Sequence, residues 1–268
     1  MTHHTHKNIG LALSGGGARG FAHIGVLKVL VEHNIPIDMI AGTSAGSIIG
    51  GAYAAGMSVD ELISMASKVG WTNMTRPSLS PLGLLSNAPM GKFLAKYFPV
   101  SRFEDLLIPF SAVACDFEKG EEAVFKDAGD LIFAIRASCA VPGVFAPLKN
   151  ANGRLFVDGG VIAPMPTDAV RQMGAEIVFA VDLLACGATF RTRPRTAIGM
   201  LFQSAMSLLR AASRNQHYHA DIVIEPQIAH LRPDEISKRD EFISLGEAAA
   251  LEAIDKIKAV IESDTPGS

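Results

Sequence analysis

The chain has 268 residues, of which 49% are hydrophobic and 19% are charged, and its 24 Lys and Arg against 27 Asp and Glu leave a formal net charge of −3. This length fits one large α/β domain or two small ones. The chain lacks the excess of basic residues that binding to nucleic acid requires. Its net charge also does not attract the surface as a whole to an anionic membrane.

Short apolar stretches alternate with amphipathic ones along the chain, which predicts a mostly parallel sheet with helices on both faces. Strands are expected at residues 9–14, 38–42, 109–116, 123–125, 155–157, 177–184 and 221–225. Helices are expected at residues 18–33, 44–55, 130–138, 166–173, 198–209 and 241–261, with one more opening at the capping box Ser58–Glu61. The predicted fold class is a three-layer α/β/α arrangement.

The ends of the chain and its cysteines bear on location. Three widely spaced cysteines, Cys115, Cys139 and Cys186, predict reduced residues and neither a disulfide framework nor a metal site. No run of about 18 apolar residues occurs, and the first residues lack the apolar core of a signal peptide. We expect a cytoplasmic protein, with peripheral contact at the inner membrane left open. Disordered tails are expected at 1–8 and 263–268, around a single domain at 9–262.

Two segments resist a regular assignment. Residues 70–90 are rich in Pro, Ser and apolar side chains without a period, which favours an irregular cap or an acyl groove over plain packing; the side chains concerned are Met74, Leu79, Leu82, Leu84 and Leu85. The second segment runs through Arg191, Arg193 and Arg195 into the apolar helix at 198–209. A solvated loop before a core or interface helix is favoured there, and contact with phospholipid is the alternative.

A glycine-rich loop, SGGGARG, follows the first predicted strand and opens a helix. Gly15, Gly17 and Gly20 spell GxGxxG, the pattern of a dinucleotide-binding loop, and Asp38 is then the candidate ribose-binding carboxylate. The same loop exposes backbone N–H groups that suit any anion, including the oxyanion of an acyl-transfer reaction. The loop alone leaves both interpretations open.

A second strand-turn-helix junction decides between them. Gly42-Thr43-Ser44-Ala45-Gly46 is GxSxG in the context of a nucleophile elbow, where a tight turn projects the serine over a helix N-terminus. The dinucleotide interpretation leaves this turn unexplained, whereas an acyl hydrolase uses both junctions. We therefore predict that Ser44 is a nucleophile and that the glycine-rich loop stabilises an oxyanion.

The nucleophile needs a proton acceptor. Asp158 in FVDGG ends a predicted strand and is followed by Gly159 and Gly160, which keep it accessible. The alternative is a triad of Ser44, Asp158 and one of His217, His219 or His230. An elbow at residue 44, after only the second strand, comes too early for the α/β-hydrolase fold in which such triads occur.

Three motifs in this order, SGGGARG, GTSAGS and DGG, resemble the bacterial patatin-like phospholipases. The likeness extends to ASCAVPGVFAP at residues 137–147, to GAEIVFAVDL and to EFISLGEAAA, and so covers nearly the whole chain. The resemblance implies a dyad without histidine, in which Ser44 attacks and Asp158 is the base. It also implies a patatin-like fold, an oxyanion hole in the glycine-rich loop, and no metal or organic cofactor.

Carried onto this chain, the family pattern gives a set of expected site residues. The oxyanion hole is expected at Gly15, Gly16, Gly17, Ala18, Arg19, Gly20 and Ala45, the elbow at Gly42, Thr43 and Gly46, and the DGG motif at Gly159 and Gly160. One departure stands out: family members often carry Asn-x-Pro shortly after the aspartate, where this chain has Ala163-Pro164-Met165-Pro166. A hydrogen bond that supports the site is therefore expected to be missing.

The predicted function is serine acyl-ester hydrolysis of a lipid or small ester, of the phospholipase A or lysophospholipase type, through an acyl-enzyme. Transient contact with a membrane surface is compatible with it, and the sequence does not set the oligomeric state. A nucleotide-binding oxidoreductase and a catalytically silent regulatory member of the fold are the alternatives.

Overall fold

A mixed sheet carries the loops of interest in the computed structural model, which describes residues 7–186 and 194–263. In these residues the sheet has the strand order β11-β10-β1-β2-β5-β9-β8, and β6 pairs with β5. The strands are β1 Ile9–Leu13, β2 Met39–Thr43, β5 Phe110–Asp116, β6 Glu121–Phe125, β8 Leu148–Lys149, β9 Leu155–Asp158, β10 Ile177–Val181 and β11 Ile222–Ile224. The pairs from β11 through β5 are parallel, while β6, β8 and β9 pair antiparallel. The predicted parallel sheet thus has an antiparallel end.

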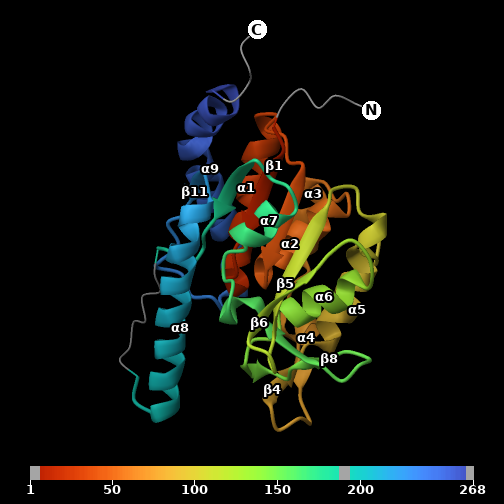
Figure 1. The fold of residues 1–268 in the computed structure, drawn as a ribbon. Coiled ribbons are helices and arrows are strands. Elements are labelled where there is room, and N and C mark those ends of the chain that lie inside the picture. The colour runs from red at the N-terminus through yellow and green to blue at the C-terminus, as the bar shows by residue number, and fades with distance from the viewer. Residues whose placement is uncertain (1–6, 187–193, 264–268) are drawn as a thin grey trace.

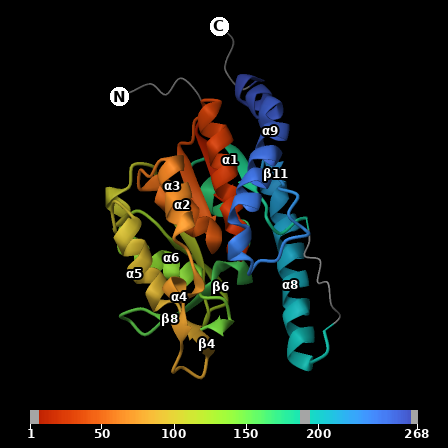
Figure 2. The same cartoon turned by 180° about the vertical axis from the view of Figure 1, so that it is seen from behind.

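Helices cover both faces of this sheet and form the predicted three layers (Figures 1 and 2). They are α1 Phe21–Glu32, α2 Ala45–Ala54, α3 Val59–Ser67, α4 Trp71–Met74, α5 Ala88–Tyr97, α6 Leu131–Ser138, α7 Thr167–Gln172, α8 Ala197–Gln216 and α9 Arg239–Ser263. Short 3₁₀ turns are η1 Gly17–Gly20, η2 Phe103–Asp105, η3 Gly159–Val161, η4 His217–His219 and η5 Ile236–Lys238. None of the helices in the described ranges is long and apolar enough to cross a membrane.

The two faces of the sheet have separate cores, as the alternation of side chains along a strand requires. Ile9, Leu11 and Leu13 of β1 are fully buried in the larger core, to which α1 and α9 contribute, and Ala12 is buried in a second core with Val170 of α7. Helices α1 and α9 approach closely at Gly246, where a Cβ would collide with the backbone carbonyl of Ala22. The last helix is therefore part of the main core.

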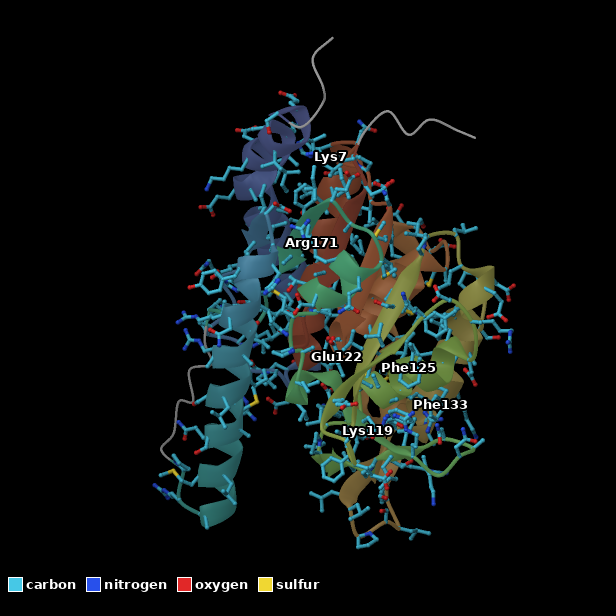
Figure 3. The ribbon with its side chains drawn as sticks, viewed as in Figure 1. Lys7, Lys119, Glu122, Phe125, Phe133 and Arg171 are labelled. Atoms are coloured by element: carbon cyan, nitrogen blue, oxygen red, sulfur yellow. The ribbon has the colours of Figure 1, made fainter. Side chains whose placement is uncertain are left out.

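Aromatic side chains fill the antiparallel end of the sheet. Phe125 of β6 and Phe133 of α6, labelled in Figure 3, lie edge to face with ring centroids 6.1 Å apart. Phe156 of β9 packs edge-on against both, at 5.2 Å and 6.2 Å. Edge-to-face packing of this kind is favourable beyond the area that it buries. The cluster packs β9, whose last residue is Asp158, against β6 and α6.

The expectation of irregular structure at residues 70–90 is corrected. This stretch contains α4, β3 Arg76–Pro77 and β4 Gly83–Ser86, and α5 starts just before its end. Strand β4 pairs with β7 Gly143–Phe145, so a second sheet has the order β3-β4-β7. Helix α5 is not among the predicted helices; it carries Pro89 in its first turn, where proline is well tolerated.

Residues 1–6 and 264–268, most of the two predicted tails, lie outside the described residues, as do Arg191 and Arg193. Asn8 is tied to the start of β10, since its carbonyl accepts the N–H groups of Glu176 and Ile177. The helix expected at 198–209 is the first part of the longer α8. Figure 1 shows α8 extending past the sheet, beyond the layer of helices that cover it.

Candidate active site

The register of the sheet brings the two predicted dyad residues together. Thr43, the last residue of β2, pairs with Val113 of β5, and the next residue of β5, Ala114, pairs with Asp158 of β9. Strand β6 occupies the other edge of β5 along these residues. Strands β2 and β9 therefore pair one after the other along the same edge of β5. Asp158 lies at the point on this edge where β2 ends and the turn at Ser44 begins.

Ser44 has the backbone strain that a nucleophile elbow requires. Its φ of 51° and ψ of −120° fall outside the regions that residues with a side chain prefer. The turn is held by Ser138, whose hydroxyl accepts the Ser44 N–H at 2.8 Å and donates to the Val113 carbonyl at 2.6 Å. Gly46 lies so close to the Leu13 carbonyl that a Cβ would collide with it. The predicted GxSxG geometry is present.

The glycine-rich loop lies beside this turn, because β1 and β2 are neighbours in the sheet. Its backbone N–H groups are not equivalent. The N–H of Gly15 donates to Pro164 O at 2.9 Å and that of Ala18 to Pro233 O at 2.7 Å. The N–H of Arg19 makes a longer bond of 3.3 Å within the loop. These three donors are engaged, which removes them from the expected oxyanion set.

Three other N–H groups remain available among the described residues. Those of Gly16 and Gly17 precede or open the 3₁₀ turn, and that of Ala45 opens α2, so no residue of the same helix accepts them. No other described residue accepts them either. Gly20 is in close contact with Ala45, since a Cβ on Gly20 would lie 2.5 Å from the Cβ of Ala45. The open donors are thus Gly16, Gly17 and Ala45.

The Arg19 side chain holds the glycine-rich loop in place by hydrogen bonds. The guanidinium is 2% exposed and donates to the carbonyl of Leu231 from Nη2 at 2.8 Å and Nε at 3.2 Å. A further bond of 3.3 Å runs from Nη1 to Leu183 O. Burial lowers the pKa of this group from its ordinary value. The side chain is directed toward segments that come late in the sequence.

Asp158 is a buried carboxylate with one oxygen free. Its Oδ1 accepts the N–H of Gly160 at 2.7 Å, while Oδ2 is buried and has no hydrogen-bond partner among the described residues. Burial raises the pKa of Asp158 to about 6, and the Ser44 hydroxyl and the Gly160 N–H act in the opposite direction. The hydroxyl is thus close enough to favour the charged carboxylate, although the contact does not have hydrogen-bond geometry. A carboxylate of this kind can accept a proton near neutral pH.

The segment after the DGG motif is supported by its backbone. The carbonyl of Ala163 accepts the hydroxyl of Thr43 at 2.7 Å, and the carbonyl of Pro164 accepts the Gly15 N–H. These bonds join the segment to both strand-turn-helix junctions. The segment is therefore attached to the site although the usual asparagine is absent. Each link is made by a backbone carbonyl, and the identity of the side chains in the sequence does not predict such links.

A mostly apolar cavity of about 170 Å³ opens beside Ser44. Its wall continues from the glycine-rich loop and α2 across α3, α4 and α5, with side chains that include Ile49, Met65, Met74, Met90 and Phe93. Trp71 also lines it and is half exposed, so this side chain lies at its rim. The prediction that residues 70–90 contribute to an apolar groove applies to Met74. Leu79, Leu82 and Leu84 are exposed and do not line the cavity.

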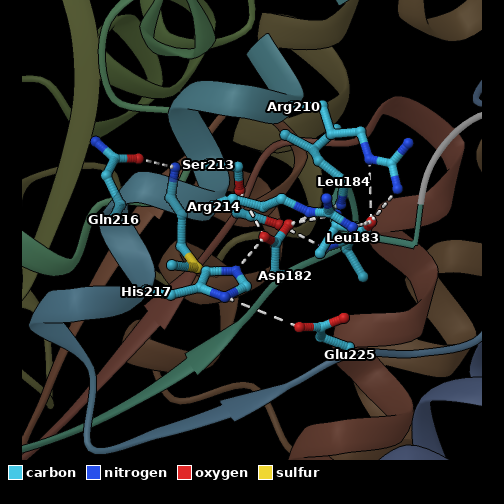
Figure 4. A network of polar contacts seen from close by, with 12 residues as sticks. Asp182, Leu183, Leu184, Arg210, Ser213, Arg214, Gln216, His217 and Glu225 are labelled. Atoms are coloured by element: carbon cyan, nitrogen blue, oxygen red, sulfur yellow. Dashed lines mark hydrogen bonds and ion pairs between the residues drawn. The ribbon is translucent and has the colours of Figure 1, made fainter. Parts of the chain in front are cut away.

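The alternative with a histidine finds no support in the geometry. His217 Nε2 bonds Asp182 Oδ2 at 2.7 Å, and this bond raises the pKa of His217 (Figure 4). His219 pairs with Asp168 at 3.0 Å and His230 with Glu241 at 3.2 Å. Ser213 also donates to Asp182, so this cluster anchors α8 to the end of β10.

The dinucleotide alternative loses its carboxylate. Asp38 precedes β2 and accepts the N–H of Ile9 at 2.7 Å, at the amino ends of the strands. The glycine-rich loop follows the carboxyl end of β1. A ribose-binding carboxylate would have to lie near that loop. Among the described residues, no group of three or more His, Cys, Asp or Glu side chains is arranged to hold a metal ion.

Three residues at the site were not predicted individually. Ser138 and Cys139 belong to the stretch ASCAVPGVFAP, which carried the family resemblance but gave no role to either. The Cys139 thiol is fully buried at the cavity wall, and burial raises its pKa. Pro233 acts through its backbone carbonyl, for which a sequence gives no signal.

Comparison with known proteins bears on the same residues. The patatin-like phospholipase family matches residues 11–171. An uncharacterised NTE family protein of Mycobacterium tuberculosis is 39% identical over 178 residues, which are 65% of this chain and 49% of that protein. Patatin-like phospholipase domain-containing protein 6 of Homo sapiens is 36% identical over 188 residues, 67% of this chain and 14% of that protein. The chain thus spans about half the length of the mycobacterial relative.

A likeness in fold is also found among solved structures. VipD from Legionella pneumophila superposes with a TM-score of 0.56 at 16% identity, covering 94% of this chain and 67% of VipD. At this level of identity the likeness concerns the fold alone.

Proposed function

The chain belongs to the patatin-like phospholipase family, and from this premise we propose that it hydrolyses carboxylic esters of lipids through a dyad of Ser44 and Asp158. The family supports lipid acyl hydrolysis as the general activity. The observation that supports the dyad is the sheet register, in which Asp158 and the strained turn at Ser44 follow each other along one edge of β5. Asp158 is buried, and its Oδ2 has no hydrogen-bond partner among the described residues.

In the proposed reaction Asp158 accepts the Ser44 proton while Ser44 Oγ attacks the ester carbonyl carbon. The negative charge that develops on the carbonyl oxygen is received by the free N–H groups of Gly16, Gly17 and Ala45. The N-terminus of α2 adds its dipole at the same place. When the tetrahedral intermediate collapses, the C–O bond to the alcohol breaks and Asp158 returns the proton to it.

The second half of the reaction repeats these roles with water. Asp158 takes a proton from the water as its oxygen attacks the acyl-enzyme carbonyl. The bond to Ser44 Oγ then breaks, Asp158 returns the proton to Oγ, and a carboxylic acid and the free serine are released. The pKa of about 6 leaves Asp158 ionised at neutral pH and still basic enough to share the proton. One carboxylate therefore serves both steps without a histidine.

The cavity beside Ser44 suits one acyl chain. Ligand pockets that enclose a whole small molecule measure roughly 300–1,000 Å³, whereas this one measures about 170 Å³. Its wall of Met, Ile and Phe side chains favours a hydrocarbon, and none of the described residues that line it is charged. The acyl chain would enter the cavity while the alcohol part stays outside.

The test is hydrolysis of nitrophenyl butyrate by the Ser44→Ala and Asp158→Asn variants. We expect the turnover to fall by about 10³-fold or more in each, because each removes one member of a cooperating pair. Ser111→Ala is the matched control, since Ser111 is a buried serine of β5 whose hydroxyl has no hydrogen-bond partner in the part of the chain that the structure describes. Turnover near the wild-type level in either folded dyad variant would contradict the proposal.

Labelling with a fluorophosphonate probe separates an active enzyme from a silent member of the fold. The probe should modify Ser44 in the wild-type protein and should fail to modify the Ser44→Ala variant. A folded wild-type protein that resists the probe and hydrolyses no ester would instead indicate a regulatory role.

A further inference from the structure

Two separate projections of the molecule expose large apolar side chains. The first is the hairpin of β3 and β4, with Leu79, Leu82 and Leu84, and the second is the first half of α8, with Met200, Leu201 and Leu208. Leu79 is fully exposed, and Leu201 and Leu208 are each more than two-thirds exposed. Single exposed leucines are common on soluble proteins, but grouped ones mark a surface that meets another apolar phase.

The apolar face of α8 is directed away from the body of the protein. Leu201 and Leu208 are seven residues apart and so share one side of the helix. Arg210 and Ser213 attach the second half of α8 to the body, through the Ala185 carbonyl and Asp182. The side chain of Leu209 packs over Gly160 of the DGG motif. The helix is therefore anchored beside the dyad, with its apolar stripe exposed.

Both projections lie at the same end of the molecule. Figures 1 and 2 show the start of α8 and the β3–β4 hairpin at the lower end, beyond the carboxyl ends of the parallel strands. Ser44 follows the carboxyl end of β2, and Trp71 at the cavity rim belongs to α4, which directly precedes the hairpin. An external surface in contact with both projections would therefore lie against the end of the protein that contains Ser44.

The charged side chains of the two sequence stretches that contain the projections have one sign. Residues 62–103 and 194–220 contain no Asp or Glu, although acidic residues outnumber basic ones in the whole chain. The same two stretches carry eight basic side chains: Lys68, Arg76, Lys92, Lys96, Arg102, Arg195, Arg210 and Arg214. Arg76 lies in the hairpin and Arg195 just before α8; both are exposed, and neither forms an ion pair with another described residue. Anionic lipid head groups complement such a surface.

We propose that the β3–β4 hairpin and the first half of α8 dock on a lipid bilayer that contains anionic head groups. Apolar side chains enter the boundary between head groups and acyl chains while basic side chains stay among the head groups. A second copy of the chain fits this face less well, because a symmetric contact would set like basic residues against each other. Such docking would bring lipid esters to Ser44, and in this respect it rests on the proposed function.

Sedimentation with vesicles tests the docking separately from catalysis. The full chain carrying Ser44→Ala is mixed with vesicles of phosphatidylcholine alone or of phosphatidylcholine and phosphatidylglycerol in equal parts. We expect stronger binding to the anionic vesicles. The pairs Leu79→Ser with Leu82→Ser and Leu201→Ser with Leu208→Ser should each weaken it by about tenfold or more. Leu251→Ser in α9, a half-exposed leucine outside both projections, is the matched control and should bind as the parent does.

The outcomes separate this proposal from the proposed function. In the background with Ser44 intact, the leucine pairs should leave hydrolysis of soluble nitrophenyl butyrate unchanged and reduce hydrolysis of vesicle phospholipid. Loss of vesicle binding in the pairs without any esterase activity in the wild type would uphold docking and refute the hydrolase. Unchanged vesicle binding in both pairs overturns docking. Conversion of a dimer to a monomer by the α8 pair, with vesicle binding unchanged, would assign that face to a second copy.

Equal binding to neutral and anionic vesicles would overturn the electrostatic part of the proposal. Arg76→Glu with Arg195→Glu tests the same part from the protein side. This pair should lower binding to anionic vesicles by about tenfold at low salt and should have little effect at high salt, where screening removes the attraction.

Discussion

Asp158 follows Ser44 along one edge of β5, at the level where β2 ends and β9 takes over. The two residues come from distant parts of the sequence, and they lie close together only because β2 and β9 both pair with β5. The junction of a parallel and an antiparallel strand on one edge creates the gap in which a serine turn and a carboxylate meet. The electrostatic properties of the site follow from the burial of this gap.

The rate of ester hydrolysis should depend on the ionisation of Asp158. Because burial raises its pKa to about 6, we expect kcat/KM to be constant above that pH and to fall by about tenfold for each pH unit well below it. The measurement is a pH profile with nitrophenyl butyrate, with circular dichroism at each pH to show that the fold persists. An inflection near 4 would contradict the raised pKa.

The same carboxylate should lower the stability of the protein. A pKa of about 6 in the folded state and an ordinary value of 3.8 in the unfolded state mean that the folded protein binds the proton more tightly. The free energy of unfolding therefore declines as the pH rises from about 4 to about 6, by up to about 3 kcal/mol, and stays lower above that range.

Replacing the carboxylate by its neutral isostere should recover part of this stability. We expect Asp158→Asn to raise the free energy of unfolding by about 1–3 kcal/mol at pH 8 and to have little effect near pH 4, while it abolishes turnover. Chemical denaturation at both pH values is the measurement. Asp127→Asn, at an exposed aspartate, is the control and should change neither quantity. An Asp158→Asn variant that is less stable at pH 8 would refute the prediction.

Ser138 should matter both for stability and for turnover. Its hydroxyl satisfies the buried N–H of Ser44 and the buried carbonyl of Val113, so Ser138→Ala leaves both without that partner. We expect a loss of about 2–3 kcal/mol in the free energy of unfolding, and a lower kcat because the elbow is loosened.

Ser111→Ala provides the comparison for Ser138. The Ser111 hydroxyl is buried in the same strand that supplies Val113, and no described residue is its hydrogen-bond partner. Its removal should therefore be neutral or slightly stabilising, with kcat unchanged. Urea denaturation and nitrophenyl ester kinetics measure both variants. Equal effects of the two substitutions would mean that the bridge through Ser138 has no special role.

Arg19→Lys should release the glycine-rich loop. A lysine cannot reproduce the three bonds of the guanidinium to the carbonyls of Leu231 and Leu183. We expect the free energy of unfolding to fall by about 2 kcal/mol and kcat to fall by about tenfold or more, since the oxyanion donors lose their fixed positions.

A second arginine separates these two effects. Arg171 also binds backbone carbonyls, those of His219 and Glu176, but lies in α7 away from the loop (Figure 3). Arg171→Lys should lower stability and leave kcat unchanged. If Arg19→Lys loses stability with kcat intact, the loop does not depend on the guanidinium for its donor geometry.

Much of the site could be predicted because its motifs are local. The loop after β1 and the turn after β2 each lie within a few residues, and the steric need for small residues makes them visible in the sequence. The pairing of β9 with β5 is not local, so the sequence marks Asp158 as a candidate base through its place at a strand end before two glycines, and it does not reveal the register that brings Asp158 to Ser44. Arg19 was correctly named as a residue of the loop, but its carbonyl partners cannot be identified from side-chain patterns.

The regular structure within residues 70–90 was missed for a related reason. Strands of two to four residues carry almost no periodic signal, and β4 gains its stability from β7, which lies well over fifty residues away. The leucines of this region are apolar, which favours a groove in the sequence analysis. The sequence does not show that their side chains point into solvent. Only Met74 of that group faces the cavity.

The hydrogen bonds of Ala18 and Arg19 to Pro233 and Leu231 have a consequence for the order in which the protein is made. The family match ends at residue 171, yet the loop that it contains is held by carbonyls from the last part of the chain. A ribosome completes the serine turn early and supplies the partners of the glycine-rich loop near the end of synthesis. The nascent chain therefore contains Ser44 well before the glycine-rich loop has the partners that hold it in place.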